Sequence, residues 1–176
     1  AGATDTGSAS VTVDNTAPEE TTVSISPSSD VGTSTELTCS AEASDADGGT
    51  PTITYVWTNT TEDTTLGDES TLTLTTLSSS AGDTITCTAT ATDRDGGSDS
   101  ASASVTVDNT APEITKVTIT PSTGVTTDTT LTCSVESSDA DGDSPTITYA
   151  WTNDDEGTSL GSGASITLTA ATSSPG

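Results

Sequence analysis

The chain of 176 residues contains no histidine, no methionine and no phenylalanine, and only two lysine or arginine residues. Its formal charge is −25, from 27 acidic and 2 basic residues. Nucleic acids and anionic membrane surfaces are bound through basic patches, so we expect neither as a partner. The chain also lacks the run of about 18 apolar residues that a membrane-spanning helix needs, so we expect no membrane insertion of this segment.

Side chains that carry catalysis are equally scarce. Without histidine, and with Arg94 and Lys116 as the basic side chains, no nucleophile has a base at a recognisable spacing. Carboxylate pairs such as Asp68 and Glu69 lie in expected turns, without an aromatic cleft that would hold a sugar. We therefore expect that the chain is not an enzyme.

Apolar residues make up only 28% of the chain, a share that is typical of disordered segments. Their spacing argues for a fold instead. Cys39, Trp57 and Cys87 each lie in a run of alternating apolar and small polar residues, the pattern of a strand with one buried face. A cysteine on each of two strands beside a tryptophan from a third is typical of an immunoglobulin-like sandwich. We therefore predict an all-β fold with a core built on these three residues.

The sequence repeats itself with a period of 94 residues, so that Cys39 and Trp57 recur as Cys133 and Trp151. One period is close to the size of a single immunoglobulin-like domain. We expect Trp57 and Trp151 to occupy equivalent core positions. Three parts are expected along the chain. They are strand G of a preceding or neighbouring repeat (1–13), a complete repeat (14–107), and a second repeat that lacks strands F and G within this chain (108–176).

The alternation also places the individual strands, which are separated by turns rich in Pro, Gly and Asp. In the complete repeat the expected ranges are 22–26, 36–43, 53–58, 64–66, 70–76, 84–92 and 101–107. The second repeat is expected to run through its own strands A to E. Residues 8–13 are expected to form the orphan strand G.

Three cysteines in a chain rich in threonine and serine fit an oxidising, extracellular setting. We predict a disulfide between Cys39 and Cys87, which would contribute roughly 3–4.5 kcal/mol in the chain-entropy treatment. A redox or metal role for this pair is the alternative, although no C-x-x-C spacing is present. Cys133 is expected to be unpaired within the chain and to have its partner in sequence outside it. A free buried thiol or an intermolecular bond is the alternative for Cys133.

These motifs together resemble the tandem immunoglobulin-like repeats, related to the PKD and cadherin-like groups, of very large secreted bacterial surface proteins. The residues that carry the resemblance lie at 37–39, 45–48, 53–57, 83–87 and 107–112. The resemblance implies tandem Greek-key β-sandwiches, the second incomplete here, in a secreted or cell-surface protein. One position departs from antibody-type domains, because Ile85 stands where those have a corner tyrosine. Antibody-like recognition is therefore not implied.

Acidic loops and hinges are the candidate ligand site. The candidate residues are Asp45, Asp47, Asp93, Asp95, Asp108 and Asn109. Calcium takes several oxygen ligands, and closely spaced aspartates on loops that contain glycine can supply them. The hinge Asp-Asn-Thr-Ala-Pro also resembles the linker at which cadherin-like repeats bind calcium between domains, so Ca²⁺ at the junctions is one expectation. The alternative is that these Asp-Gly loops only form turns on a very acidic surface.

The triplet Asn59-Thr60-Thr61 matches an acceptor for N-linked sugars, a match that also arises by chance in a sequence rich in threonine. Both interpretations stay open at this point.

Near-identical repeats favour a structural role, as a stalk or a head-to-tail filament of a secreted surface protein. The alternative is an adhesive or carbohydrate-binding module, which should show an exposed aromatic platform. All four aromatic residues fall in the two expected strands C. An aromatic platform could therefore be built only from Tyr55 and Trp57 or from their equivalents, Tyr149 and Trp151. Because residues 1–13 match the strand that the second repeat lacks, we expect copies of the chain as head-to-tail partners. The rival is one window of a longer continuous polypeptide.

Overall fold

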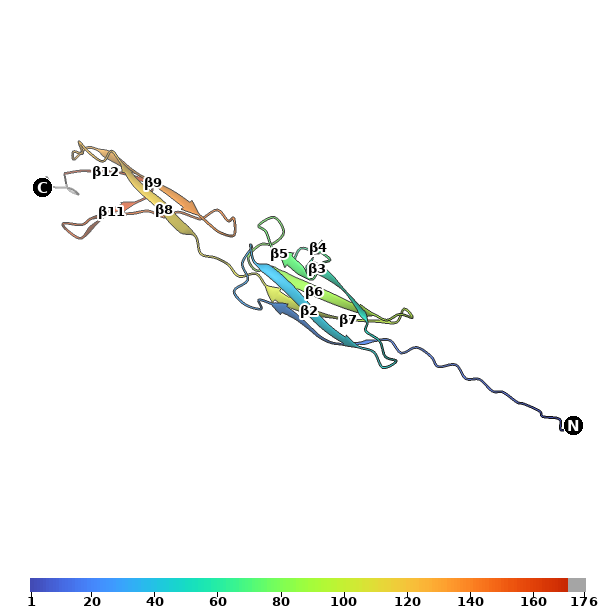
Figure 1. Cartoon of the computed structure of the whole chain (residues 1–176). Helices are drawn as coiled ribbons and strands as arrows, with labels where there is room; N and C mark the ends of the chain where they lie inside the picture. The colour runs from blue at the N-terminus through green and yellow to red at the C-terminus, as the bar shows by residue number, and fades with distance from the viewer. Residues whose placement is uncertain (171–176) are drawn as a thin grey trace. The chain divides into compact units, whose positions relative to one another are not determined.

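The computed structural model describes residues 1–170, except for the side chains of Glu20 and Thr21, and divides into unit 1 (1–108) and unit 2 (109–176) (Figure 1). All regular elements of the described residues are β-strands, and all strand pairs are antiparallel. The predicted all-β class is confirmed. Nowhere in residues 1–170 is there a helix long and apolar enough to cross a membrane.

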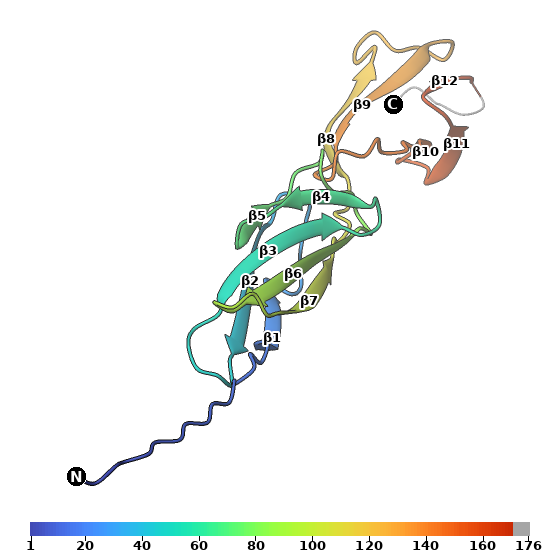
Figure 2. The same cartoon turned by 90° about the vertical axis from the view of Figure 1, so that its right-hand side faces the viewer.

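Unit 1 consists of two sheets. Its strands are β1 (Glu19–Ser26), β2 (Glu36–Ser44), β3 (Thr52–Asn59), β4 (Thr64–Gly67), β5 (Thr71–Thr73), β6 (Thr84–Thr92) and β7 (Ser98–Thr106). One sheet has the order β1-β2-β5 and the other has the order β4-β3-β6-β7. The two sheets lie face to face, with β3, β6 and β7 on one side and β1 and β2 on the other (Figure 2). The strand positions expected from the alternation agree with these bounds to within three residues, apart from a shorter β5.

The alternation of apolar and small polar residues decides which side chains enter the core. On β6, Ile85, Cys87, Ala89 and Ala91 are fully buried, while the threonines between them are half-buried on the other face. Trp57 is also fully buried, and its indole Nε1 donates a hydrogen bond to the backbone oxygen of Glu69 at 2.9 Å. A sequence poor in large apolar residues thus forms a core because the few that exist fall on one face of each strand.

Unit 2 repeats this arrangement in part. Its strands are β8 (Glu113–Thr120), β9 (Thr130–Ser138), β10 (Ala150–Asn153), β11 (Thr158–Ser162) and β12 (Ser165–Thr167). They form sheets with the orders β12-β9-β8 and β10-β11. The pairing of β8 with β9 keeps the register of β1 with β2, since Val117 lies opposite Val135 as Val23 lies opposite Ala41. The last six residues expected in this repeat, 171–176, lie outside the described residues.

One expected strand is shortened and another is not formed among the described residues. Residues 146–149 are not in a strand, although the equivalent part of β3 pairs with β6. Residues 8–13 are not in a strand either, and Val11 and Val13 are 89% and 85% exposed. A strand needs a ladder partner for its backbone N–H and C=O groups. Neither segment has one among the described residues, so the alternating pattern alone does not produce a strand there.

Candidate functional site

The predicted disulfide is present: Cys39 on β2 and Cys87 on β6 are bonded at 2.05 Å, with a Cα–Cα distance of 6.4 Å. The bond joins the two sheets of unit 1. Trp57 lies directly opposite Cys87 in the register of β3 with β6 and belongs to the same core cluster. Cys133 is half-buried and has no disulfide partner within residues 1–170.

The acidic loops of unit 1 form turns through their own aspartates. Asp45 Oδ1 accepts a hydrogen bond from the backbone N–H of Asp47 at 2.7 Å, in the loop after β2. Asp93 Oδ1 accepts from the backbone N–H of Asp95 at 2.9 Å, in the loop after β6. A side-chain oxygen that binds the N–H two residues later is the Asx turn that aspartate favours in loops. In each loop the Oδ1 atom of the first aspartate, Asp45 or Asp93, is therefore used by the turn itself.

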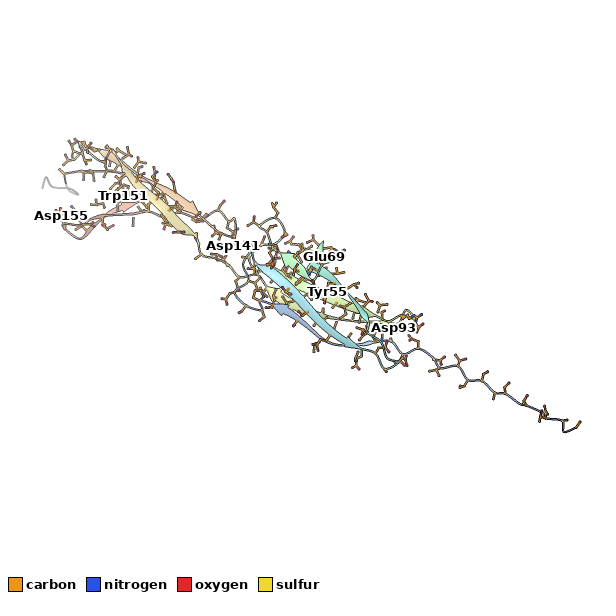
Figure 3. All side chains as sticks on the ribbon, in the orientation of Figure 1. Tyr55, Glu69, Asp93, Asp141, Trp151 and Asp155 are labelled. Atoms are coloured by element: carbon orange, nitrogen blue, oxygen red, sulfur yellow. A yellow bond between two sulfur atoms is a disulfide. The ribbon has the colours of Figure 1, made fainter. Side chains whose placement is uncertain are left out.

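The hinge segment 14–18 lies against these two loops. Asn15 Nδ2 donates to Asp93 Oδ2 at 2.9 Å, and the backbone N–H of Thr16 donates to Asp47 Oδ2 at 2.5 Å. Pro18, which ends the hinge, is buried. We call Asn15, Thr16, Asp47 and Asp93 the hinge clamp. Figure 3 shows Asp93 at the end of unit 1 where the N-terminal segment enters.

Gly97 makes the close approach of the clamp possible. A Cβ at this position would lie 2.5 Å from Asp93 Oδ2 and 2.9 Å from both Asn15 Nδ2 and the Cα of Ala17. The backbone N–H of Gly97 also donates to Asp93 Oδ1 at 2.8 Å. The hinge backbone therefore occupies space that any other residue at 97 would take.

The environment of Asp93 favours its ionised form. The Asn15 side-chain hydrogen bond, followed by the backbone N–H groups of Gly97 and Asp95, lowers the pKa of the Asp93 carboxyl below its ordinary value, against an opposing desolvation effect. Donors that bind the carboxylate stabilise its charge, so the clamp and the ionisation of Asp93 support each other.

The six candidate metal ligands are not brought together in one cluster. Asp108 follows β7 at the end opposite to Asp93, and its backbone N–H donates to the oxygen of Val31 at 2.7 Å. Asn109 belongs to unit 2. Asp45, Asp47, Asp93 and Asp95 remain as the residues that could hold a cation at one end. No group of three or more His, Cys, Asp or Glu side chains in the described part of the chain is arranged to hold a metal ion.

The 94-residue period relates the two hinges, since Asn15 and Asn109 are equivalent residues. Asn15 is the hinge residue that precedes the repeat in which Asp45 and Asp93 lie. In unit 2 the backbone N–H of Thr110 donates to Asp141 Oδ2 at 2.5 Å, as Thr16 does to Asp47. Asp141 is almost fully buried and its backbone N–H donates to Asp139 Oδ1 at 2.8 Å, which repeats the Asx turn. Figure 3 labels Asp141 in this position. Each hinge is thus bonded to the loop after the second strand of the repeat that follows it.

Asn59 is unsuitable as a glycan acceptor, because its side chain is 1% exposed and already bonded. Its Nδ2 donates to Asp83 Oδ2 at 2.7 Å and to the backbone oxygen of Ser78 at 3.3 Å. Asp83 Oδ2 also accepts from the backbone N–H of Ser80 at 2.9 Å. This buried network fixes the turn before β6, where antibody-type domains use a tyrosine. Sequence reasoning missed this network, since an N-x-Thr triplet pointed to the surface.

The apolar face of unit 2 is open. Ile119 and Val125 are 47% and 43% exposed, whereas their unit 1 equivalents, Ile25 and Val31, are 8% and 0% exposed. A groove of about 280 Å³ runs along this face. It is lined by Ile114, Val117, Ile119, Cys133, Val135, Ile147, Thr148, Tyr149, Ala150 and Trp151. In unit 1 the same face is covered by β6, β7 and Val107, which follows β7.

The aromatic residues do not form a surface platform. Trp57 is fully buried, Trp151 is 8% exposed, and Tyr55 and Tyr149 are half-buried. Tyr55 packs against the core of unit 1 and Tyr149 lines the groove of unit 2.

The chain matches no family model, no curated protein and no solved structure.

Proposed function

We propose that this chain is a structural segment of an extracellular stalk or filament, built from tandem immunoglobulin-like repeats of a secreted surface protein. The observation that carries the proposal is the recurrence of one structural plan at an offset of 94 residues. Trp57 Nε1 donates to Glu69 O and Trp151 Nε1 donates to Gly163 O, both at 2.9 Å. The same backbone hydrogen bond from the hinge and the same register of the first two strands accompany these core bonds. Units with one plan suit a role that depends on length.

The surface chemistry supports an extracellular position. A disulfide persists in oxidising surroundings and stabilises a domain whose core is small. The strong negative charge keeps such a chain soluble and separate from nucleic acid and anionic membranes. The strand orders β1-β2-β5 and β4-β3-β6-β7 also suit an immunoglobulin-like sandwich with a disulfide between sheets.

The partners in this proposal are copies of the chain, joined head to tail. Residues 8–18 repeat residues 102–112 without a difference. In unit 1, Val105 and Val107 are buried in the core, and Asp108 N–H donates to Val31 O. The equivalent Val11 and Val13 are exposed, and so is the Val31 equivalent in unit 2. Residues 8–13 of one copy can therefore lie along the open face of unit 2 in the next.

Sedimentation velocity tests this proposal, because a contact of unlike surfaces gives open chains of copies instead of closed dimers. The wild type should form species that grow with concentration. Val11→Asp with Val13→Asp should abolish this growth, because the charges would enter an apolar groove. Ser10→Asp with Thr12→Asp is the matched control, since it adds the same two charges to the segment on the alternate face. A wild-type monomer at every concentration would contradict the head-to-tail arrangement.

The alternative function, an adhesive or carbohydrate-binding module, has no such observation in its favour. Sugar-binding platforms need exposed aromatic faces, and none of the four aromatic side chains is exposed. Calcium at the end of unit 1 stays a prediction, restricted to Asp45, Asp47, Asp93 and Asp95.

A further inference from the structure

We infer that the hinge is anchored to the repeat that follows it by direct protein hydrogen bonds, through a clamp that holds without a metal ion. The bonds are Asn15 Nδ2 to Asp93 Oδ2 and Thr16 N to Asp47 Oδ2. This inference goes beyond the proposed function, since it concerns hydrogen bonds within a single unit and stands whether or not copies of the chain associate.

Both carboxylates of the clamp accept N–H donors from the hinge, and Asp93 also accepts donors from its own loop. Asp93 accepts from its own loop through Oδ1 and from the hinge through Oδ2. Asp47 accepts from Thr16 through Oδ2. Hydrogen bonds to an ionised acceptor are stronger than neutral ones, so two short bonds from one hinge are enough to fix its path. The negative charge of these loops is therefore neutralised in part by hinge dipoles.

Gly97 provides an independent sign that the hinge belongs at this place. Its φ lies outside the left-handed region, so backbone conformation does not require glycine there. The requirement is space, because a Cβ would meet Asp93, Asn15 and Ala17 at once, each at less than 3 Å. A glycine that serves only to admit the hinge indicates that hinge and loops pack as one body.

Unit 2 repeats half of the clamp. Thr110 N–H donates to Asp141 Oδ2, as Thr16 N–H does to Asp47 Oδ2. The side chain of Asn109, by contrast, donates to the adjacent Thr110 oxygen at 3.1 Å. In unit 1 the equivalent Asn15 is bonded to the loop after β6, and this loop has no counterpart among the described residues of unit 2. The backbone half of the clamp is thus present in both units, and the amide half is present in unit 1.

Amide hydrogen exchange, read by NMR in excess EDTA, tests the clamp on the full chain. The N–H of Thr16 should exchange at least about tenfold more slowly than that of Thr12, which lies in the unpaired segment. Asn15→Ala and Asp47→Ala should each remove that difference. Asp95→Ala is the matched control, because it removes the same charge from the same end without removing a clamp acceptor.

Gly97→Ala should also release Thr16, whereas Gly32→Ala should not, because the nearest atom to a Cβ at Gly32 is 3.9 Å away. The exchange of core amides in β6 verifies that each variant is folded. If Asp47→Ala does not fold, Asn15→Ala still tests the clamp, because it changes no core residue. The comparison is made in the Val11→Asp, Val13→Asp background, because docking of residues 8–13 on another copy would also protect the Thr12 N–H. Equal exchange of Thr16 and Thr12 in this background would overturn the inference. Protection that appears only after calcium is added would overturn it as well.

Discussion

Asn59 and Asp83 are joined side chain to side chain, with 2.7 Å between Nδ2 and Oδ2, and both residues are buried. The bond links the end of β3 to the turn before β6. A corner that other sandwiches fix with a tyrosine hydroxyl is fixed here by an amide and a carboxylate. A chain without phenylalanine and with two tyrosines thus stabilises its corner with small polar side chains.

Replacing Asp83 by Ala should destabilise unit 1 by roughly 2–3 kcal/mol, because the buried Asn59 amide and the Ser80 N–H lose their acceptor. Urea denaturation measures the change, followed by tryptophan fluorescence in a Trp151→Phe background so that the signal comes from Trp57 in unit 1. Asp68→Ala, in an exposed turn, is the control and should be neutral within about 0.5 kcal/mol. Equal stability of the two variants would mean that the corner network contributes nothing.

The disulfide should account for a large part of the stability of unit 1. Replacing Cys39 and Cys87 together by Ala should lower the free energy of unfolding by roughly 3–4.5 kcal/mol, because the unfolded chain gains the entropy of an open loop. Chemical denaturation of this variant against the oxidised wild type gives the value. The Cys133→Ala variant, which removes a half-buried thiol, controls for loss of a sulfhydryl. A double variant as stable as this control would refute the prediction.

The clamp should weaken in acid. The pKa of Asp93 is lowered in the folded chain, chiefly by the Asn15 amide, from an ordinary value of 3.8. Stability that comes from a lowered pKa is fully present above the ordinary value and is lost as the pH falls through the lowered one. The Asn15 side-chain amide signal should therefore change in NMR spectra with a midpoint below pH 3.8. Charged neighbours on the same loops are Asp45, Asp47, Arg94 and Asp95.

The control for this titration is Asn15→Ala, followed through the Asp93 carboxyl carbon. Without the amide donor, the pKa of Asp93 should rise toward its ordinary value. A pKa of Asp93 that is the same with and without Asn15 would show that the hinge does not reach this carboxylate in solution.

Calcium binding at the end of unit 1 is tested by melting the chain in EDTA and in calcium. If Asp45, Asp47, Asp93 and Asp95 hold an ion, calcium should raise the Tm, and Asp45→Asn with Asp95→Asn should remove the difference. This pair leaves the clamp acceptors in place. A Tm that calcium does not change would mean that the loops serve as turns and as clamp only.

The sequence predicted those features that depend on local alternation. Strand positions, the buried face of β6 and the Cys39–Cys87 bond all follow from apolar residues at every second position. The alternation could not say whether a strand finds a partner, which is why residues 8–13 and 146–149 carry the pattern without the structure. Whether a segment finds a neighbouring strand depends on the whole fold, and a ladder of hydrogen bonds forms only where such a neighbour is present.

The sequence identified the acidic loops of the candidate site, but it did not show which hinge lies against them. Loops after the second and sixth strands do meet at one end, as their places in a sandwich suggested. Asp108 and Asn109, the equivalents of Asp14 and Asn15 one period later, do not lie with these loops of unit 1. A hinge motif occurs twice in this chain, and only contacts between distant segments decide which copy each loop binds. The burial of Asn59 had no signal in the sequence beyond its position at the end of a strand.

The most direct test of the head-to-tail arrangement is oxidative cross-linking between copies. Ala9 is the equivalent of Ala103, which packs against the core of unit 1, and Cys133 lines the groove of unit 2. Mild oxidation of the Ala9→Cys variant should give a non-reducing gel ladder at multiples of 17.3 kDa, because each copy carries one donor and one acceptor thiol. Ser10→Cys, on the alternate face, should give no more than dimers. Dimers alone from Ala9→Cys, or an equal ladder from both variants, would contradict the account.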